Sequence, residues 1–148
     1  AQGRLRARAR GRAPRPARMA GRRLNVTVVG ARDLPNVDWF SKSDPYCVCS
    51  IPGKASESIR TPTVWNNLNP EWGHEGQLED YAYGDMVRFQ IFDESSSGKR
   101  DVLIGWAELR SSDFDPRGYA GNILLKGCKK SKQHPTVNVM LGVEAADG

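Results

Sequence analysis

Residues 24–46 read LNVTVVGARDLPNVDWFSKSDPY and join a strand pattern to an acidic loop. Leu24, Val26 and Val28 fall on one face of an extended chain, and this period of two predicts a half-buried β-strand. The loop that follows carries two aspartates on either side of an aromatic pair. We therefore expect a β fold in which the first loop has a chemical role.

The remainder of the chain repeats short strand patterns that are separated by Gly, Pro, Asn and Ser turns. No segment shows a sustained helical period, except for one helical turn expected near residues 111–115, with Ser111 or Ser112 as its N-cap. These features predict an all-β, eight-stranded antiparallel Greek-key sandwich of two sheets. The expected strands are residues 24–29, 46–51, 58–65, 75–80, 87–92, 102–109, 122–126 and 136–143.

The chain divides by composition into a basic tail, residues 1–23, a sandwich, residues 24–143, and a short C-terminal tail, residues 144–148. The first segment holds nine arginines and no acid, so the net charge of +5 hides a mildly acidic body of about −4. Because it has no aromatic and almost no large aliphatic residue, we expect this segment to be disordered.

Three interpretations of the basic tail stay open. It is a solvated linker or cloning remnant, a polybasic arm that attracts anionic lipid or nucleic acid, or a targeting peptide. The targeting peptide is the weakest of the three, because serines and an amphipathic apolar face are absent from the segment.

Cysteine content and hydropathy restrict the compartment. Three cysteines without a C-x-x-C motif do not form a disulfide framework and are typical of a reducing compartment, so we expect a cytoplasmic protein. No apolar run approaches the roughly 20 residues of a membrane-spanning helix, so any membrane contact is expected to be peripheral.

Four aspartates lie in loops that a sandwich can bring to one end: Asp38, Asp44, Asp93 and Asp101. If they converge within about 5 Å, each pair repels by about 3 kcal/mol at an effective dielectric constant of about 20. Calcium would offset this repulsion, because it is a hard cation that takes roughly 6 to 8 oxygen ligands. Paired His or Cys side chains, which zinc prefers, are absent from these loops.

An EF-hand is the competing calcium motif. Residues 93–104 match its loop at positions 1, 3, 5, 6 and 9, but position 12, which should be a bidentate Glu, is Ile104. The flanking sequences are strand patterns rather than helices. The EF-hand is therefore excluded.

Four motifs in order carry a resemblance to a known family: LNVTVVGARDL, VDWFSKSDPY, NNLNPEW and FQIFDESSSGKRDVLIG. The chain from Leu24 to Val143 resembles the C2 domain family, a calcium- and phospholipid-binding β-sandwich. Its first strand directly precedes the acidic loop and its eighth strand comes last, which is similar to the phospholipase-type topology of that family.

The resemblance implies that loop aspartates bind calcium and that Ser95 stands where the family has a fifth aspartate. This neutral hydroxyl is expected to weaken binding. One implied ion is held by Asp38, Asp44, Asp93 and the carbonyl of Trp39. A second, less complete site lies between Asp93 and Asp101 with the carbonyl of Glu94.

The resemblance also implies docking to an anionic phospholipid membrane, because bound calcium cancels the negative loops and leaves positions for lipid phosphate oxygens. Trp39 and Phe40 at the loop tip are expected to insert at the headgroup boundary, although Trp39 could instead pack down as a loop anchor. Lys42, Lys99 and Arg100 are expected to add attraction to an anionic surface.

The alternative is a calcium-independent C2-like domain that binds a protein partner or serves as a scaffold. An enzyme is not expected, because the chain has only His74 and His134 and no G-x-S-x-G motif. Nucleic-acid binding is not expected of the body, which has no basic stripe with interleaved aromatic residues.

Overall fold

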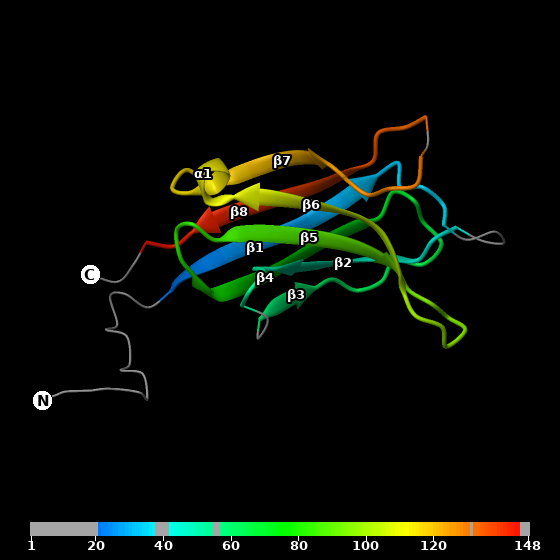
Figure 1. The fold of residues 1–148 in the computed structure, drawn as a ribbon, viewed down its shortest axis with the longest axis horizontal. Helices are drawn as coiled ribbons and strands as arrows, with labels where there is room; N and C mark the ends of the chain where they lie inside the picture. Colours follow the sequence, from blue (N-terminus) through cyan, green and yellow to red (C-terminus); the bar gives the residue numbers. More distant parts are fainter. Residues whose placement is uncertain (1–20, 38–41, 55–56, 131, 146–148) are drawn as a thin grey trace, which may run out of the picture.

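The computed structural model of the chain describes residues 21–37, 42–54, 57–130 and 132–145. It contains eight strands and one short helix, drawn in Figure 1. Their bounds are β1 Arg22–Arg32, β2 Pro45–Ser50, β3 Ser58–Arg60, β4 Glu71–Tyr81, β5 Met86–Asp93, β6 Val102–Arg110, α1 Ser111–Phe114, β7 Tyr119–Leu124 and β8 Thr136–Val143.

The strands form two four-stranded antiparallel sheets, which confirms the predicted eight-stranded sandwich, and the strand orders are β4-β1-β8-β7 and β3-β2-β5-β6. The last strand, β8, lies between β1 and β7, so the first sheet is completed by the C-terminal strand. No helix of the described segments is long and apolar enough to cross a membrane.

Alternating side chains of both sheets fill the space between them. Leu24, Val26 and Val28 are at most 2% exposed, which confirms the face predicted for β1. Cys47 and Cys49 are fully buried in the same core, and burial raises the pKa of both thiols. They are therefore packing residues rather than reactive ones.

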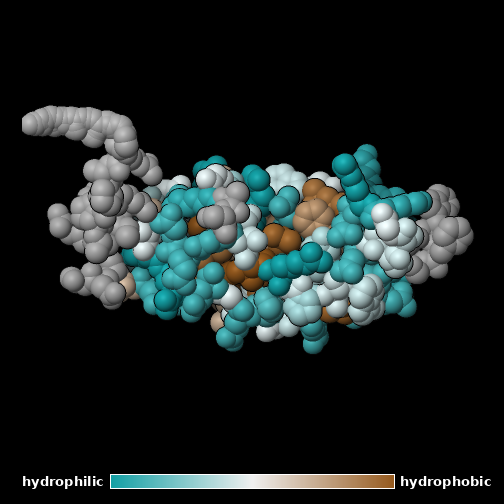
Figure 2. Space-filling view, turned by 90° about the horizontal axis from the view of Figure 1, so that it is seen from below, coloured by the Kyte–Doolittle hydropathy of each residue, from teal (hydrophilic) through white to brown (hydrophobic). Residues whose placement is uncertain are grey.

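The strands β3 and β4 are edge strands of different sheets and lie next to each other along one side of the sandwich. A Cβ atom on Gly76 would lie 2.8 Å from the side chain of Ile59, so glycine allows β4 to approach β3 at this point. Figure 2, which views the molecule from below Figure 1, shows apolar side chains in the middle of this face and hydrophilic surface around them.

The strand β1 begins at Arg22, two residues before the predicted boundary of the basic tail. The guanidinium of Arg22 donates to the Asp115 carboxylate at 2.6 Å and lies 5.5 Å from the centre of the Tyr81 ring. The carbonyl of Arg23 accepts the N–H of Glu144, a residue that was assigned to the C-terminal tail. The rest of the predicted basic tail lies outside the described residues.

The strand β3 ends at Arg60, well short of the predicted residue 65. Pro62 has no N–H and interrupts the ladder. The N–H groups of Thr61 and Val64 still reach carbonyls of β2, at 2.9 and 3.0 Å, so the chain stays beside that strand without regular pairing.

The short helix α1 forms where it was predicted, but its capping prediction was wrong. Its N-cap is Arg110, the N–H of which donates to the Asp113 carboxylate at 2.8 Å. The hydroxyl of the buried Ser111 instead donates to the carbonyl of Asp85 at 2.6 Å, in the neighbouring turn.

The connections of the sandwich fall at two ends. The β1–β2, β3–β4, β5–β6 and β7–β8 connections share one end, which we call the loop end and which lies on the right in Figure 1. The first residues of β1 and the last residues of β8 lie at the opposite end. The loop end therefore holds the described members of the predicted site.

Candidate metal and membrane-contact site

Two of the predicted site residues, Asp44 and Asp93, meet where β2 begins and β5 ends. The backbone N–H of Asp44 donates to Asp93 Oδ1 at 2.8 Å, although the two residues are 49 positions apart in the sequence. The N–H of Glu94 donates to the Asp44 carbonyl at 3.0 Å, and Pro45 pairs with Asp93 in the sheet register. The ladder between the two strands thus brings the β1–β2 and β5–β6 connections together.

The Asp44 carboxylate is oriented by the β3–β4 connection. Asp44 Oδ1 accepts the N–H of Asn66 at 2.6 Å, and Asn66 Oδ1 accepts the N–H of Lys42 at 3.0 Å. Asn66 has a positive φ of 56°, a conformation that Asn adopts more readily than most residues. The sequence predicted only a turn here; the paired asparagines of NNLNP were the available signal for a specific role.

Asp101 is held by its own loop and by β2. Its Oδ2 accepts the Tyr46 hydroxyl at 2.5 Å, and its Oδ1 accepts the N–H of Ser95 at 2.9 Å. The bond from the Ser95 N–H, followed by the bond from Tyr46, lowers the pKa of the Asp101 carboxyl. Burial, followed by the bond to Asp101, raises the pKa of Tyr46 to about 12, so the proton stays on the tyrosine.

We expect Tyr46→Phe to raise the pKa of Asp101 toward 3.8, its ordinary value, because one of two hydrogen bonds to the carboxylate is lost. A depressed carboxyl pKa stabilises the fold above the unfolded-state value, and this contribution disappears as the pH falls through the folded-state value. The free energy of unfolding of the variant should therefore fall less steeply than that of the parent chain as the pH is lowered. Carboxyl ¹³C NMR titration checks the shift, and Tyr83→Phe, on an exposed ring, is the control. An unchanged Asp101 titration would contradict the assignment.

Two predicted loop residues make other contacts. The carboxylate of Glu94 accepts from Arg60 at 3.3 Å and from the Thr63 hydroxyl at 2.5 Å, so its side chain is engaged with the β3–β4 connection. The Ser95 hydroxyl lies 3.4 Å from the Ser97 hydroxyl. The structure thus assigns structural contacts to both side chains, and the predicted role of the Glu94 carbonyl remains a prediction.

Two of the predicted metal ligands, Asp44 and Asp93, lie together among the described residues. Within the described ranges no group of three or more His, Cys, Asp or Glu side chains is arranged to hold a metal ion. Asp38, Trp39 and Phe40 lie outside the described residues, and their roles stay predictions. The Asp44 and Asp93 carboxylates offer the hard oxygen atoms that calcium takes, so the donors that are present fit two ligands of such an ion.

The basic residues predicted for membrane contact are exposed at the loop end. Lys42, Lys99 and Arg100 are all exposed, and none has an ion pair with another residue of the described part of the chain. Their charges are therefore available to an anionic surface.

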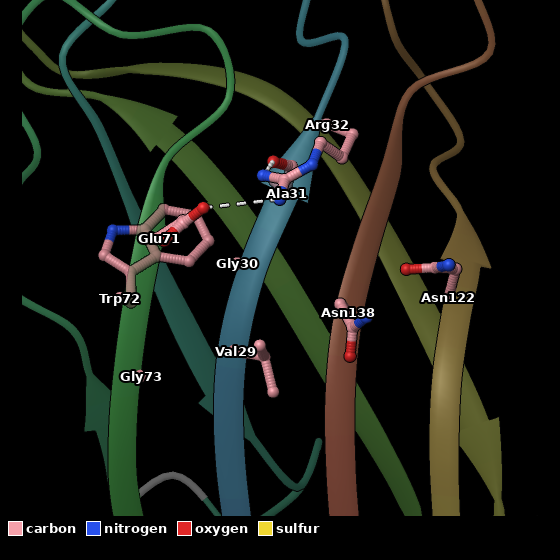
Figure 3. Close-up of a pocket in the computed structure, with 9 residues that line it drawn as sticks. All are labelled: Val29, Gly30, Ala31, Arg32, Glu71, Trp72, Gly73, Asn122 and Asn138. Carbon is pink, nitrogen blue, oxygen red and sulfur yellow. Dashed lines mark hydrogen bonds and ion pairs between the residues drawn. The ribbon is translucent and has the colours of Figure 1, made fainter.

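A hollow on the sandwich lies apart from these loops. It has a volume of about 710 Å³ and lies on the outer face of the β4-β1-β8-β7 sheet, where Figure 3 shows Arg32 beside Glu71, with a 3.4 Å ion pair, and Asn138 beside Asn122. The main-chain bulge between Val28 and Gly30 shapes its floor. This hollow contains none of the predicted site residues.

The model of the C2 domain family matches residues 22–125. The chain belongs to the C2 domain family. This C2 domain is 37% identical over 97 residues to RasGAP-activating-like protein 1 of Homo sapiens and 34% identical over 106 residues to Synaptotagmin-4 of Arabidopsis thaliana. These alignments cover 64% and 70% of the chain, but only 12% and 18% of the two relatives.

Solved structures agree on the fold. A C2 domain of plant Extended Synaptotagmin 1 superposes with a TM-score of 0.73 at 22% identity, covering 84% of this chain and 95% of that domain. Human GIVD cytosolic phospholipase A2 gives a TM-score of 0.70 at 22% identity, covering 86% of this chain and 17% of the enzyme. Membership of this family supports a membrane-binding module.

Proposed function

We propose that this C2 domain is a non-catalytic, cytoplasmic module that binds calcium at the loop end and then docks on anionic phospholipid. The observation that carries the proposal is the contact between Asp44 and Asp93, which joins the two acidic connections at one point. A family relative, Extended-Synaptotagmin 2, has been solved as a pair of C2 domains with calcium bound. Calcium would supply positive charge and open coordination positions for phosphate oxygens.

The residues around the pair prepare it for a cation. Each of the two carboxylates accepts a backbone N–H, so its orientation is fixed before any ion binds. Asp38 is the proposed third carboxylate. Because Ser95 contributes no charge, we expect weaker binding than in a site with the full set of acids.

The membrane contact is proposed to come from the tip and the flanks of the same loops. Half-insertion of Trp39 or Phe40 would contribute about 2 kcal/mol per ring. Lys42, Lys99 and Arg100 would each add on the order of 1 kcal/mol near an anionic surface.

We expect the protein to sediment with phosphatidylserine-containing vesicles in millimolar calcium and to sediment much less in chelator, because the uncompensated acids repel the lipid headgroups. Calcium should also raise the melting temperature in the absence of lipid, as a ligand that binds only the folded state must. Vesicles of phosphatidylcholine alone are the control. Equal sedimentation in calcium and chelator, together with an unchanged melting temperature, would contradict the proposal.

A calcium-independent protein-interaction or scaffold domain is the second candidate function. The neutral Ser95 and the two-carboxylate pair among the described residues favour it. The melting temperature separates the candidates, because a scaffold that ignores calcium shows no shift when calcium is added.

A further inference from the structure

The cations of the described sandwich differ in whether they form ion pairs. Those with a carboxylate partner are Arg22, Arg23, Arg32, Lys54, Arg60 and Arg88. Those without one in the described part of the chain are Lys42, Lys99, Arg100, Arg110, Arg117, Lys126, Lys129, Lys130 and Lys132. All of these except Arg110 and Arg117 belong to connections at the loop end. Uncompensated positive charge is therefore concentrated at one end of the molecule.

The β7–β8 connection carries the densest part of this charge. Residues 125–135 read LKGCKKSKQHP and contain four lysines and no acid. Lys126, Lys129 and Lys130 are exposed. This connection contributes no predicted calcium ligand, so its charge does not depend on whether an ion is bound.

Backbone pairing fixes the start of this connection against β6. The N–H of Trp106 donates to the Lys126 carbonyl at 3.0 Å, and the N–H of Lys126 donates to the Trp106 carbonyl at 2.7 Å. A Cβ atom on Gly105 would lie 2.5 Å from Cys128 Sγ, so glycine is needed for the segment to lie on the strand. The ammonium of Lys126 sits 5.3 Å from the centre of the Trp106 ring. The lysines therefore extend from an anchored segment.

The antiparallel pairing runs this segment toward the first residues of β6. Val102 and Leu103 at that end are 49% and 42% exposed. From Lys126 onward the chain runs in the direction of these two residues, and Cys128 still lies against Gly105 of β6. We call Val102, Leu103, Lys126, Lys129 and Lys130 the lysine edge.

We propose that the lysine edge is a second lipid-contact surface, which binds anionic headgroups without calcium. The combination of uncompensated lysines with exposed aliphatic side chains is typical of surfaces that lie at the membrane interface. The edge also shares the loop end with Asp44 and Asp93, so one lipid surface can meet both. The inference rests on the proposed membrane function, but it does not rest on calcium binding.

Nucleic acid is the other polyanion that such lysines could meet. Sequence-tolerant binding of single strands uses exposed aromatic faces on which bases stack. The aromatic residue of this region, Trp106, is half-buried and lies against Lys126, while the exposed neighbours are aliphatic. These features favour the lipid surface.

The test is vesicle binding in chelator at low salt, with phosphatidylserine in phosphatidylcholine vesicles. Lys129→Gln/Lys130→Gln in the full chain should weaken binding by about 25-fold, since each lysine near an anionic surface contributes about fivefold, equivalent to about 1 kcal/mol. Arg110→Gln/Arg117→Gln removes the same charge and should change binding by less than about twofold, because these residues lie at the end of the sandwich opposite to the docked surface. Leu103→Ser should also weaken vesicle binding, and by the same factor at high salt as at low salt, because the lost contact is apolar.

Three results would overturn the proposal: equal losses in the two double variants, no binding of the parent chain in chelator, or tighter binding to RNA than to vesicles with the same lysine dependence. Unchanged melting temperatures of the variants exclude misfolding as the cause of a loss. Failure here is separable from failure of the calcium proposal. A chain without a working lysine edge still gains vesicle binding on adding calcium, whereas a chain without a calcium site keeps its chelator-resistant binding.

Discussion

Asp93→Asn is expected to abolish the calcium-dependent part of vesicle binding and to lower calcium affinity by at least about tenfold, because it removes one charged ligand of a divalent ion. The substitution is nearly isosteric, and the amide oxygen can still accept the N–H of Asp44, which the carboxylate accepts at 2.8 Å. The strand ends should therefore stay in place. Titration calorimetry with calcium and vesicle sedimentation measure the two effects.

The matched control is Glu75→Gln on β4, which also removes one negative charge but lies on an exposed strand position outside the loop end. It should bind calcium as the parent chain does. If both variants weaken calcium binding equally, the effect is one of net charge rather than ligation, and the assignment of Asp93 fails.

Asp115→Ala is expected to lower the free energy of unfolding by about 3 kcal/mol, the lower end of the range for breaking a buried ion pair, since Arg22 is partly exposed. The Asp115 side chain is 6% exposed and accepts from Arg22 at 2.6 Å and from the Tyr81 hydroxyl at 2.7 Å. Alanine would leave the buried hydroxyl and the guanidinium without this partner. Urea unfolding measures the change.

Asp113→Ala is the comparison for that prediction. Asp113 is exposed and accepts the Arg110 N–H at the start of α1, so its removal should cost about 1 kcal/mol, as for an ordinary helix cap. Asp115→Asn keeps an acceptor and should fall between the two alanine variants. Equal losses for Asp113→Ala and Asp115→Ala would show that the buried pair contributes no more to stability than an ordinary helix cap does.

The fold was predictable because the strands turn alternate side chains toward the core. Leu24, Val26 and Val28 alternate in the sequence as they do in the structure, and the second sheet follows the same rule. The strand boundaries were less predictable where a residue bonds to a partner that is distant in the sequence. Arg22 reads as part of an arginine-rich tail until its bond to Asp115, 93 positions away, places it in β1.

The proximity of two candidate site residues was predictable from the family motifs. These motifs singled out Asp44 and Asp93, which the ladder between β2 and β5 brings together. The roles of Asn66 and Tyr46 were not predictable, because each depends on a hydrogen bond between segments that no local pattern connects. Asp38 remains a prediction outside the described residues.

The placement of β1 beside β8 has a mechanical consequence. The strands are antiparallel neighbours, and the first residues of one pair with the last of the other, with Leu24 opposite Val143. A force that pulls the start of β1 away from the end of β8 would therefore break the hydrogen bonds between these strands one after another, instead of loading all of them at once. We therefore expect the domain to unfold at low force when it is pulled in this way, with the first hydrogen bonds breaking at the end farthest from the acidic loops.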